Sequence, residues 1–317
     1  MDTKNIRKIG ILGAGTMGHG IAQCFAVKGY RVGVFDANPE ALKSTPDRIR
    51  SSLDVFEALG LLGDDTVTRC LENLTLSDRL EAVTESSDLI IECIDENIDL
   101  KRRVFARVET ATDPRTILCT NTSAISITEI GRGLQSRQRF LGTHFWNPPS
   151  IIPCVEVIRS EFTADAVFDT VVALMKTIGK EPIRVHKDVP GFVGNRMQHA
   201  LQREAMSLVE NGIAEPEDVD RVVKFGFGLR LALMGPLERA DLGGLDVTYQ
   251  VQKYLLKYLD NRTEPSQFLE KMVKKGHKGL KTGQGFYAWD RKKAEKAVKE
   301  RDRLLLTLIR LVSERKT

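Results

Sequence analysis

Two residues, His144 and Glu156, have the side chains of a general base and of the carboxylate that orients it. His144 lies in the stretch Phe140-Leu-Gly-Thr-His-Phe-Trp-Asn-Pro-Pro149, and Glu156 lies in the apolar run Pro153-Cys-Val-Glu-Val-Ile158. Histidine side chains change charge near neutral pH, so an imidazole can accept a proton during a reaction. A carboxylate beside it fixes its tautomer and stabilises the imidazolium that forms. The two residues therefore predict proton transfer.

If Glu156 lies on a strand, the strand geometry also determines which residues surround its side chain. Successive side chains of a strand point to opposite faces, so Glu156 lies opposite the two flanking valines and shares its face with Cys154 and Ile158. We expect this carboxylate to be half buried and to need a partner, for which an imidazole is suited. Two simpler alternatives stay open here, a solvent-facing Glu156 on an edge strand and a hydrogen-bonded core histidine at His144.

A glycine-rich motif, Gly13-Ala-Gly-Thr-Met-Gly18, follows the first apolar run and opens a helix that extends to about Lys28. Its first glycine permits a tight turn, its second allows the backbone to approach a pyrophosphate, and its third allows close packing of helix and strand. The second apolar run ends at Asp36, whose carboxylate can accept hydrogen bonds from ribose hydroxyls. The predicted cofactor contacts here are Gly13, Ala14, Gly15, Thr16, Met17, Gly18 and Asp36.

Asp36 also indicates which dinucleotide would bind. A carboxylate at this position repels a 2′-phosphate, and the next residues, Ala37 and Asn38, supply no arginine to bind one. The motif therefore favours NAD over NADP, with a flavin as the remaining alternative.

Short apolar runs alternate with helical patterns over about the first 185 residues. The runs occupy residues 8–12, 31–35, 88–92, 116–119, the two strands that carry His144 and Glu156, and residues 182–186. This alternation is typical of a parallel, doubly wound α/β sheet of Rossmann type. Residues 39–77 have helical composition with a break near Gly60, which predicts two helices there.

Beyond residue 187 no segment has a strand pattern. Helices are expected over residues 192–210, 216–224, 236–259, 265–274 and 291–315. We therefore predict an NAD-binding Rossmann-like domain over residues 1–187 and an all-helical C-terminal domain over residues 188–317.

Composition excludes several classes of protein. The chain has 317 residues, of which 42% are hydrophobic, and its 47 basic and 43 acidic residues are interleaved, so nucleic-acid binding is not expected. Its five cysteines form no CxxC pair, which predicts neither a disulfide framework nor a metal site. No apolar stretch is long enough to cross a bilayer and the N-terminus leads straight into a strand, so we expect no membrane attachment and a cytoplasmic location.

Several motifs, in order along nearly the whole chain, identify a known family. They are Gly13-Ala-Gly-Thr-Met-Gly-His-Gly-Ile-Ala22, Glu96-Asn-Ile-Asp-Leu-Lys101, Asn121-Thr-Ser-Ala124, His144-Phe-Trp-Asn-Pro148, Val155-Glu-Val157, Pro190-Gly-Phe-Val-Gly-Asn-Arg196, Gly235-Pro236, Gly244-Leu-Asp246 and Lys281-Thr-Gly-Gln-Gly-Phe-Tyr287. Together they resemble the NAD-dependent L-3-hydroxyacyl-CoA dehydrogenases, whose relatives include lambda-crystallin/gulonate dehydrogenase and carnitine dehydrogenase.

The resemblance implies interconversion of a (3S)-3-hydroxyacyl-CoA, of short chain such as 3-hydroxybutyryl-CoA, and the 3-oxoacyl-CoA in fatty acid metabolism. It also implies that the helical half binds substrate and forms a homodimer. In this family pattern His144 is the base, Glu156 orients it, and Ser123 and Asn195 lie beside the reacting oxygen, where hydrogen bonds steady developing charge. The positions that correspond to cofactor contacts are Ser123, Asn147, Glu96, Lys101 and Lys281.

Each of these positions also has a simpler explanation. Glu96 and Lys101 could form a surface ion pair at a helix start, and Ser123 could cap a helix or form a turn. Asn195 could lie on a solvated helix face, and Lys281 could be a loop charge.

One departure from the family pattern concerns the substrate. Acyl-CoA members have a serine and, seven residues later, a lysine that faces the CoA phosphates, whereas this chain has Ser52 followed by Leu59, near two acidic residues. Phosphates are normally bound by Lys, Arg or backbone donors. The nearby cations Lys43, Arg48 and Arg50 could take the place of the missing lysine.

A second departure is the longer segment of residues 226–236, which carries Arg230. An arginine there could bind a free carboxylate in a bidentate fork, or form an ordinary ion pair. The predicted substrate contacts are therefore Ser52, Ser123, Asn195 and Arg230. The alternatives to the thioester are the same hydride chemistry on a free 3-hydroxy carboxylic acid, similar to gulonate, carnitine or an aromatic acid, and a crystallin-like NAD binder without activity.

Overall fold

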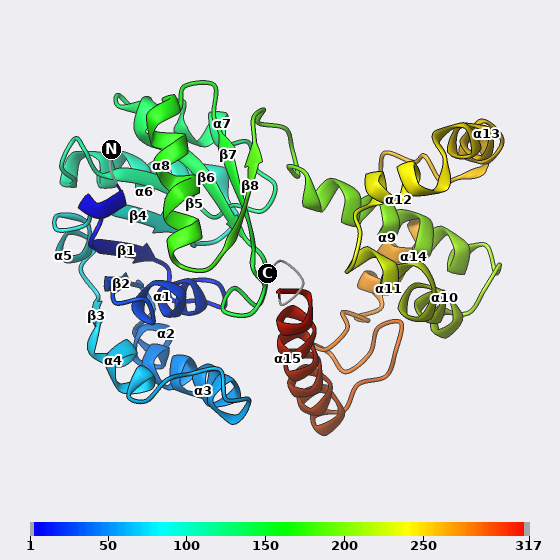
Figure 1. The fold of residues 1–317 in the computed structure, drawn as a ribbon, viewed down its shortest axis with the longest axis horizontal. Helices are drawn as coiled ribbons and strands as arrows, with labels where there is room; N and C mark the ends of the chain where they lie inside the picture. Colours follow the sequence, from blue (N-terminus) through cyan, green and yellow to red (C-terminus); the bar gives the residue numbers. More distant parts are fainter. Residues whose placement is uncertain (1–2, 314–317) are drawn as a thin grey trace. The chain divides into compact units, whose positions relative to one another are not determined.

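The chain forms two compact units, Met1–Arg196 and Met197–Thr317 (Figure 1). This computed structural model describes residues 3–313. Within residues 3–313, no helix is both long and apolar enough to cross a membrane.

An eight-stranded sheet forms the centre of the first unit, with strand order β3-β2-β1-β4-β5-β6-β7-β8. Neighbouring strands from β3 across to β6 are parallel. This order confirms the Rossmann-type sheet expected from the sequence. The strands are β1 (Lys8–Leu12), β2 (Arg31–Phe35), β3 (Leu74–Ser77), β4 (Leu89–Glu92), β5 (Ile117–Thr120), β6 (Phe140–Phe145), β7 (Cys154–Arg159) and β8 (Glu181–Val185).

The last two strands correct the expectation of a wholly parallel sheet. Strand β7 pairs with β6 in the antiparallel direction, and β8 is parallel to β7. A parallel pair needs a crossover connection of about a dozen residues or more, whereas residues 146–153, which join β6 to β7, are too few to cross the sheet. The chain therefore turns back beside β6.

Helices cover both faces of this sheet. The helices are α1 (Gly18–Ala26), α2 (Pro39–Lys43), α3 (Thr45–Ala58), α4 (Thr66–Glu72), α5 (Leu80–Thr84), α6 (Ile98–Ala111), α7 (Ile127–Gly131) and α8 (Asp165–Thr177), with short 3-10 turns η1 (Thr3–Asn5) and η2 (Arg137–Arg139). The prediction of two helices over residues 39–77 was wrong, because the segment forms three helices and ends in edge strand β3, whose four residues are too short to show a clear strand period.

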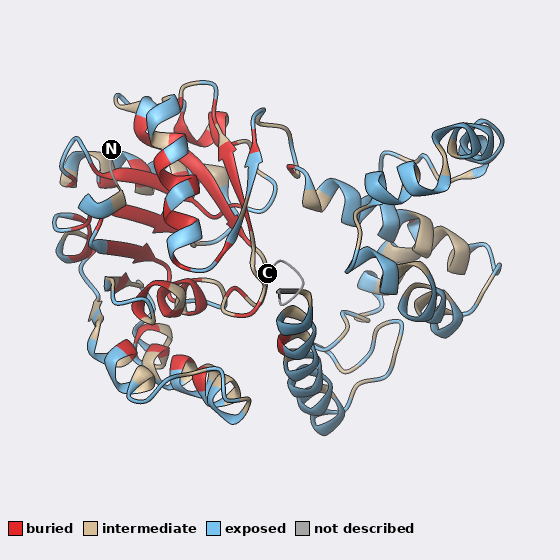
Figure 2. Cartoon of the chain, in the orientation of Figure 1, coloured by how far each residue is buried: buried red, intermediate tan, exposed pale blue. Residues whose placement is uncertain are grey.

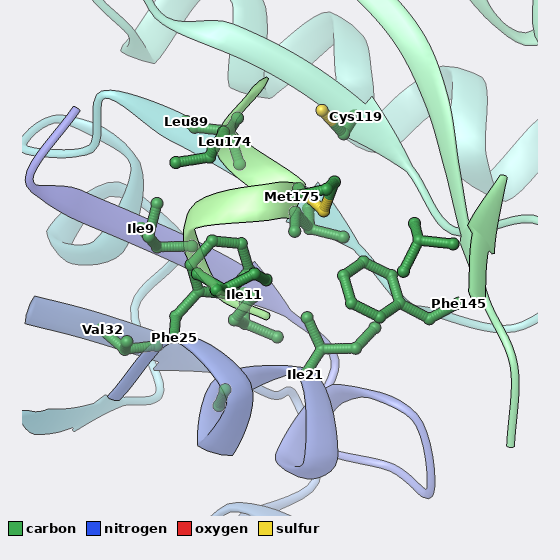
Figure 3. Packing of buried hydrophobic residues seen from close by; sticks show 14 of the residues in the cluster. Ile9, Ile11, Ile21, Phe25, Val32, Leu89, Cys119, Phe145, Leu174 and Met175 are labelled. Carbon is green, nitrogen blue, oxygen red and sulfur yellow. The ribbon is translucent and has the colours of Figure 1, made fainter. Parts of the chain in front are cut away.

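Side chains of each strand alternate between two hydrophobic clusters, one on each face. Ile9 and Ile11 of β1 belong to the cluster that packs against α1 and α8 (Figure 3). Leu12 and Ile90 belong to the other cluster, which includes residues of α5, α6 and α7. Figure 2 shows that the strands of this sheet are mostly buried. The core is therefore rigid enough to hold side chains at the strand ends in fixed positions.

The second unit consists of helices. They are α9 (Gly194–Glu210), whose first residues belong to the first unit, α10 (Pro216–Val222), the π-helical η3 (Val223–Phe227), α11 (Gly228–Leu231), α12 (Pro236–Gly243), α13 (Leu245–Leu255), the 3-10 turn η4 (Leu256–Tyr258), α14 (Gln267–Lys274) and α15 (Arg291–Ser313). The single helix expected over residues 236–259 was wrong, because Gly244, with φ of +88°, interrupts it. Residues 314 and 315 of the helix expected over 291–315 lie outside the described residues.

Candidate active site

His144 and Glu156 lie directly opposite each other on the antiparallel strands β6 and β7. His144 Nδ1 and Glu156 Oε2 are 2.8 Å apart, a hydrogen-bond distance. Only 6% of His144 and 1% of Glu156 are exposed. The expectation of a half-buried Glu156 was therefore wrong, because β8 covers the far side of β7 and leaves Glu156 on an interior strand.

Glu156 uses its second oxygen for a different part of the chain. Its Oε1 accepts hydrogen bonds from the backbone N–H groups of Val193, at 2.9 Å, and Gly194, at 3.0 Å. Burial acts to raise the pKa of Glu156, but the hydrogen bonds from His144 and these two amides lower it below its ordinary value. The carboxylate therefore stays ionised beside the imidazole.

The loop that carries Ser123 is fixed by Glu96. Glu96 Oε1 accepts hydrogen bonds from Thr122 Oγ1 at 2.6 Å, from Ser123 N at 2.9 Å and from Ala124 N at 3.2 Å. Asn195 Nδ2 donates to the Ser123 carbonyl oxygen at 2.7 Å. The structure therefore brings Ser123, Asn195 and Glu96 together, while the Ser123 side chain stays on an exposed residue.

Lys101 is one of the most deeply buried polar side chains, with 1% exposed, so the alternative of a surface pair with Glu96 was wrong. Its ammonium contacts Glu92 Oε1 at 2.6 Å and Glu96 Oε2 at 3.4 Å. Glu92, at the end of β4, was not predicted as a site residue. The available signal was a carboxylate at the end of an apolar strand, where functional residues of parallel sheets gather.

The glycine-rich loop has the shape that a dinucleotide requires. Gly13 has φ of +102°, and a Cβ on Gly18 would meet the Gly13 carbonyl oxygen at 1.7 Å, so neither position accommodates a side chain. A Cβ on Gly15 would meet no atom within 4 Å, which leaves open space where a pyrophosphate would approach. Helix α1 has no side-chain cap at its N-terminus, so its first amides can bind phosphate.

Asp36 is attached to this loop. Its Oδ2 accepts a hydrogen bond from Ala14 N at 2.6 Å, and its Oδ1 accepts one from Asn38 N at 2.7 Å. The carboxylate therefore fixes the loop relative to the end of β2. Its contact with ribose hydroxyls, like the contacts of Thr16 and Met17, stays a prediction.

Asn147 lies in the connection between β6 and β7. Lys180 Nζ holds this connection by donating to the carbonyl oxygens of Pro149 and, at 2.9 Å, Ile152. Ser52, on α3, reaches the same connection, since its Oγ lies 3.3 Å from Ser150 Oγ.

Arg48, on the same helix as Ser52, uses one guanidinium nitrogen for bonds to the backbone. Its guanidinium donates to the backbone carbonyl oxygens of Ala14 and, at 3.1 Å, Ala41. Lys43 and Arg50 are exposed, and the replacement of the missing lysine by one of these three cations stays a prediction.

Two predicted residues belong to the second unit. Lys281 lines a mostly apolar cavity of about 650 Å³ between α9, α10, α14 and the loop that follows α14. Arg230 lines a separate hollow of about 500 Å³ on α11 to α13. Their contacts with cofactor and substrate stay predictions.

Comparison with known families decides the identity. Residues 8–189 match the family described as 3-hydroxyacyl-CoA dehydrogenase, NAD binding domain, and residues 191–289 match the family described as 3-hydroxyacyl-CoA dehydrogenase, C-terminal domain. This chain belongs to the 3-hydroxyacyl-CoA dehydrogenase family. The resemblance inferred from the sequence motifs is thereby confirmed, and with it the class of enzyme, an NAD-dependent oxidoreductase of the 3-hydroxyacyl-CoA dehydrogenase type.

Relatives of this 3-hydroxyacyl-CoA dehydrogenase-type enzyme differ in their substrates. The chain is 36% identical to 5-formyl-3-hydroxy-2-methylpyridine 4-carboxylate 5-dehydrogenase of Mesorhizobium japonicum, over 98% of this chain and 99% of that protein. It is 38% identical to a probable 3-hydroxybutyryl-CoA dehydrogenase of Bacillus subtilis, over 90% of this chain and 99% of that protein.

Similar solved structures likewise include enzymes named for a free carboxylic acid and enzymes named for an acyl-CoA. A crystal structure of the pyridine carboxylic acid 5-dehydrogenase, described as an NAD⁺-dependent dismutase, has a TM-score of 0.91 at 34% identity and covers 97% of this chain and 99% of that one. A crystal structure of (S)-3-hydroxybutyryl-CoA dehydrogenase from Ralstonia eutropha has a TM-score of 0.76 at 35% identity and covers 90% of this chain and all of that one.

The family match stops before the last helix of this dehydrogenase, and its described residues include no group suited to a metal ion. The family match ends at residue 289, so α15 lies beyond it. Among the described residues, no group of three or more His, Cys, Asp and Glu side chains could hold a metal ion.

Proposed function

We propose that this enzyme oxidises a secondary alcohol with His144 as the general base. The observation that carries the proposal is the buried contact between His144 Nδ1 and Glu156 Oε2 at 2.8 Å. With Nδ1 donating to the carboxylate, the other ring nitrogen, Nε2, accepts the proton of the substrate hydroxyl. NAD, when bound, accepts the hydride that leaves the same carbon.

The remaining residues stabilise the charges that develop. Glu156 stays ionised and steadies the imidazolium that forms on His144. The Ser123 hydroxyl donates to the reacting oxygen, and Asn195 keeps the Ser123 backbone in place through its 2.7 Å hydrogen bond. In the reverse direction His144 returns the proton, and the enzyme acts as a reductase.

The first candidate substrate is a short-chain (3S)-3-hydroxyacyl-CoA, which becomes the 3-oxoacyl-CoA. Support comes from the two family matches, which together span residues 8–189 and 191–289, and from the 38% identity to the probable 3-hydroxybutyryl-CoA dehydrogenase of Bacillus subtilis.

The second candidate is a free hydroxy carboxylic acid, and the surface of α3 favours it. Leu59 stands where the family's acyl-CoA members have a lysine, Asp54 and Glu57 are exposed on the same helix, and Arg48 is bound to backbone carbonyl groups. The relative that matches 98% of this chain is named for a free pyridine carboxylate. In this case Arg230 would bind the carboxylate.

A substrate panel separates the two candidates. Initial rates are measured with 3-hydroxybutyryl-CoA, free 3-hydroxybutyrate, gulonate and an aromatic hydroxy acid, each with NAD and with NADP. If the substrate is an acyl-CoA, the enzyme should turn over the thioester with saturation. Turnover of a free acid without turnover of the thioester would instead support the free hydroxy acid as substrate. In either case the His144→Gln variant loses at least about 10²-fold in kcat. Full activity in that variant would overturn the proposed mechanism.

A further inference from the structure

Three hydrogen bonds attach the chain at the start of α9 to the candidate site, and two of them reach the proposed dyad. Val193 N and Gly194 N donate to Glu156 Oε1, and the Asn195 side chain donates to the Ser123 carbonyl oxygen. The backbone just before these residues has an uncommon conformation, with φ of +76° at Gly191 and +51° at Phe192. The first turn of α9 is therefore held in one position against β7.

Gly194 also lies against the ring of Trp146. A Cβ built on Gly194 would lie 2.1 Å from Cζ2 of Trp146, 2.8 Å from Cη2 and 3.2 Å from Cε2, so the indole occupies the space of a side chain. Trp146 follows His144 by two residues on the same side of the chain, and their ring centroids are 5.5 Å apart. A methyl group at position 194 would have to displace either the indole or the first turn of α9.

We infer that Gly194 is a positioning residue for the catalytic dyad: because it has no side chain, Trp146 can pack against the amide whose N–H group fixes Glu156, and Glu156 in turn fixes His144. This inference rests on the proposed role of His144 as the base. Gly194 acts on His144 through Glu156, and it begins the same helical turn as Asn195, which holds the Ser123 backbone.

The electrostatic surroundings of Glu156 allow the position of its carboxylate to be followed through its pKa. Among residues 3–313, the titratable groups that interact with its carboxylate are the His144 imidazole on β6 and the Cys154 thiol on its own strand. Burial raises the pKa of Cys154 to about 11, so this thiol stays neutral in the acidic range where Glu156 titrates. A change in the titration of Glu156 therefore reports on its hydrogen bonds to His144 and to the two amides.

The test begins with Gly194→Ala. Displacement of the dyad lowers kcat by about ten- to a hundredfold. The matched control is Gly133→Ala, since a Cβ on Gly133 would meet no atom within 4 Å and should leave kcat unchanged.

Repeating the Gly194→Ala change in a Trp146→Phe variant tests whether the contact with the Trp146 ring causes the loss of kcat. The Trp146→Phe change removes Cζ2 and Cη2, the two indole atoms that a Cβ on residue 194 would approach most closely. In the Trp146→Phe background, the added Gly194→Ala change should lower kcat by less than about twofold. The same fold loss in both backgrounds, or full kcat in folded Gly194→Ala, overturns the inference. If Gly194→Ala alone does not fold, the comparison within the Trp146→Phe background decides.

Titration of the carboxylate separates this inference from the proposed function. In protein labelled with ¹³C at the glutamate carboxyl carbons and without substrate, the pKa of Glu156 should be higher in Gly194→Ala than in the unchanged protein, because two N–H donors to its charged form are weakened. An unchanged pKa in Gly194→Ala would refute the positioning role. A raised pKa together with full activity of His144→Gln would refute the proposed function and leave the positioning role intact.

Discussion

The two carboxylate oxygens of Glu156 accept hydrogen bonds from two different structural elements. One accepts from His144 on β6, and the other accepts from the two amides at the start of α9. A carboxylate that is 1% exposed would cost several kcal/mol if it were unpaired, and these three donors offset that cost. At the scale of single residues, the proposed base therefore depends on contacts that come from residues distant in the sequence.

Acidification should remove the stability that Glu156 contributes. Although burial acts to raise its pKa, hydrogen bonds keep it below the ordinary value of 4.5. A carboxyl group whose pKa is lowered by folding stabilises the folded state above its unfolded pKa, and this stability is lost as the pH falls through the folded pKa. We expect the difference in unfolding free energy between the unchanged protein and Glu156→Gln to be constant near neutral pH and to shrink below pH 4.5.

Urea unfolding over a series of pH values measures this difference. Glu161→Gln is the control, because Glu161 is an exposed carboxylate shortly after β7 and its replacement should show no such pH dependence. A difference for Glu156→Gln that grows on acidification contradicts the expected sign.

At the scale of elements, a buried ion pair joins helix α6 to the end of strand β4. Lys101 and Glu92 are 1% and 0% exposed at their side chains, and Thr120 Oγ1 donates to the second oxygen of Glu92 at 2.7 Å. Burial raises the pKa of Glu92, and Lys101 and the hydrogen bonds oppose that effect. Lys101 therefore supplies the positive charge that offsets the burial of the Glu92 carboxylate. It also contacts Glu96, whose other oxygen holds the Ser123 loop.

Lys101→Met should destabilise the protein by about 3–5 kcal/mol, because it leaves the Glu92 carboxylate buried without its partner. The matched control on the same helix is Arg107→Met, which breaks an ion pair with Glu81 in which the arginine side chain is 66% exposed, and which should cost at most about 1 kcal/mol. Chemical denaturation of both variants measures the two costs. Equal costs would show that the buried pair has no special role.

At the scale of the whole molecule, the helical unit leaves much of its apolar surface uncovered. Helices α9 to α14 contain no buried residue (Figure 2). Side chains such as Leu237 and Leu242 on α12 are 81% and 76% exposed. Apolar surface of this kind marks an interaction site in soluble proteins. We propose that a second copy of the chain covers it, which agrees with the homodimer that the family resemblance implies.

Light scattering should therefore give twice the mass of one chain. The double change Leu237→Lys and Leu242→Lys should shift the protein toward the monomer, because charged groups would be buried in the interface. Leu61→Lys, which alters a leucine of the first unit that is 39% exposed, should leave the mass unchanged. A monomeric mass for the unchanged protein would contradict the proposal.

Features that depend on neighbouring residues were predicted correctly. The glycine-rich loop, the strand ends at residues 12 and 35 and the NAD preference follow from turn chemistry and side-chain type within about 25 residues. The strand that carries Glu156 was predicted, but its antiparallel direction and the short strand β3 were missed, because strand direction depends on connection length and partner choice, and four residues do not establish a period.

The sequence by itself determined the dinucleotide motif and a histidine and a carboxylate suited to proton transfer, because residue type and local spacing fix those properties. Its resemblance to a known family added that the protein is an NAD-dependent dehydrogenase. Only the tertiary structure decided that Glu156 is buried, that Lys101 pairs with Glu92, and that residues 193 and 194 hold the dyad, since these contacts bring together residues up to 38 positions apart. Burial and long-range hydrogen bonds arise when strands and helices pack, and no local pattern specifies which groups then meet.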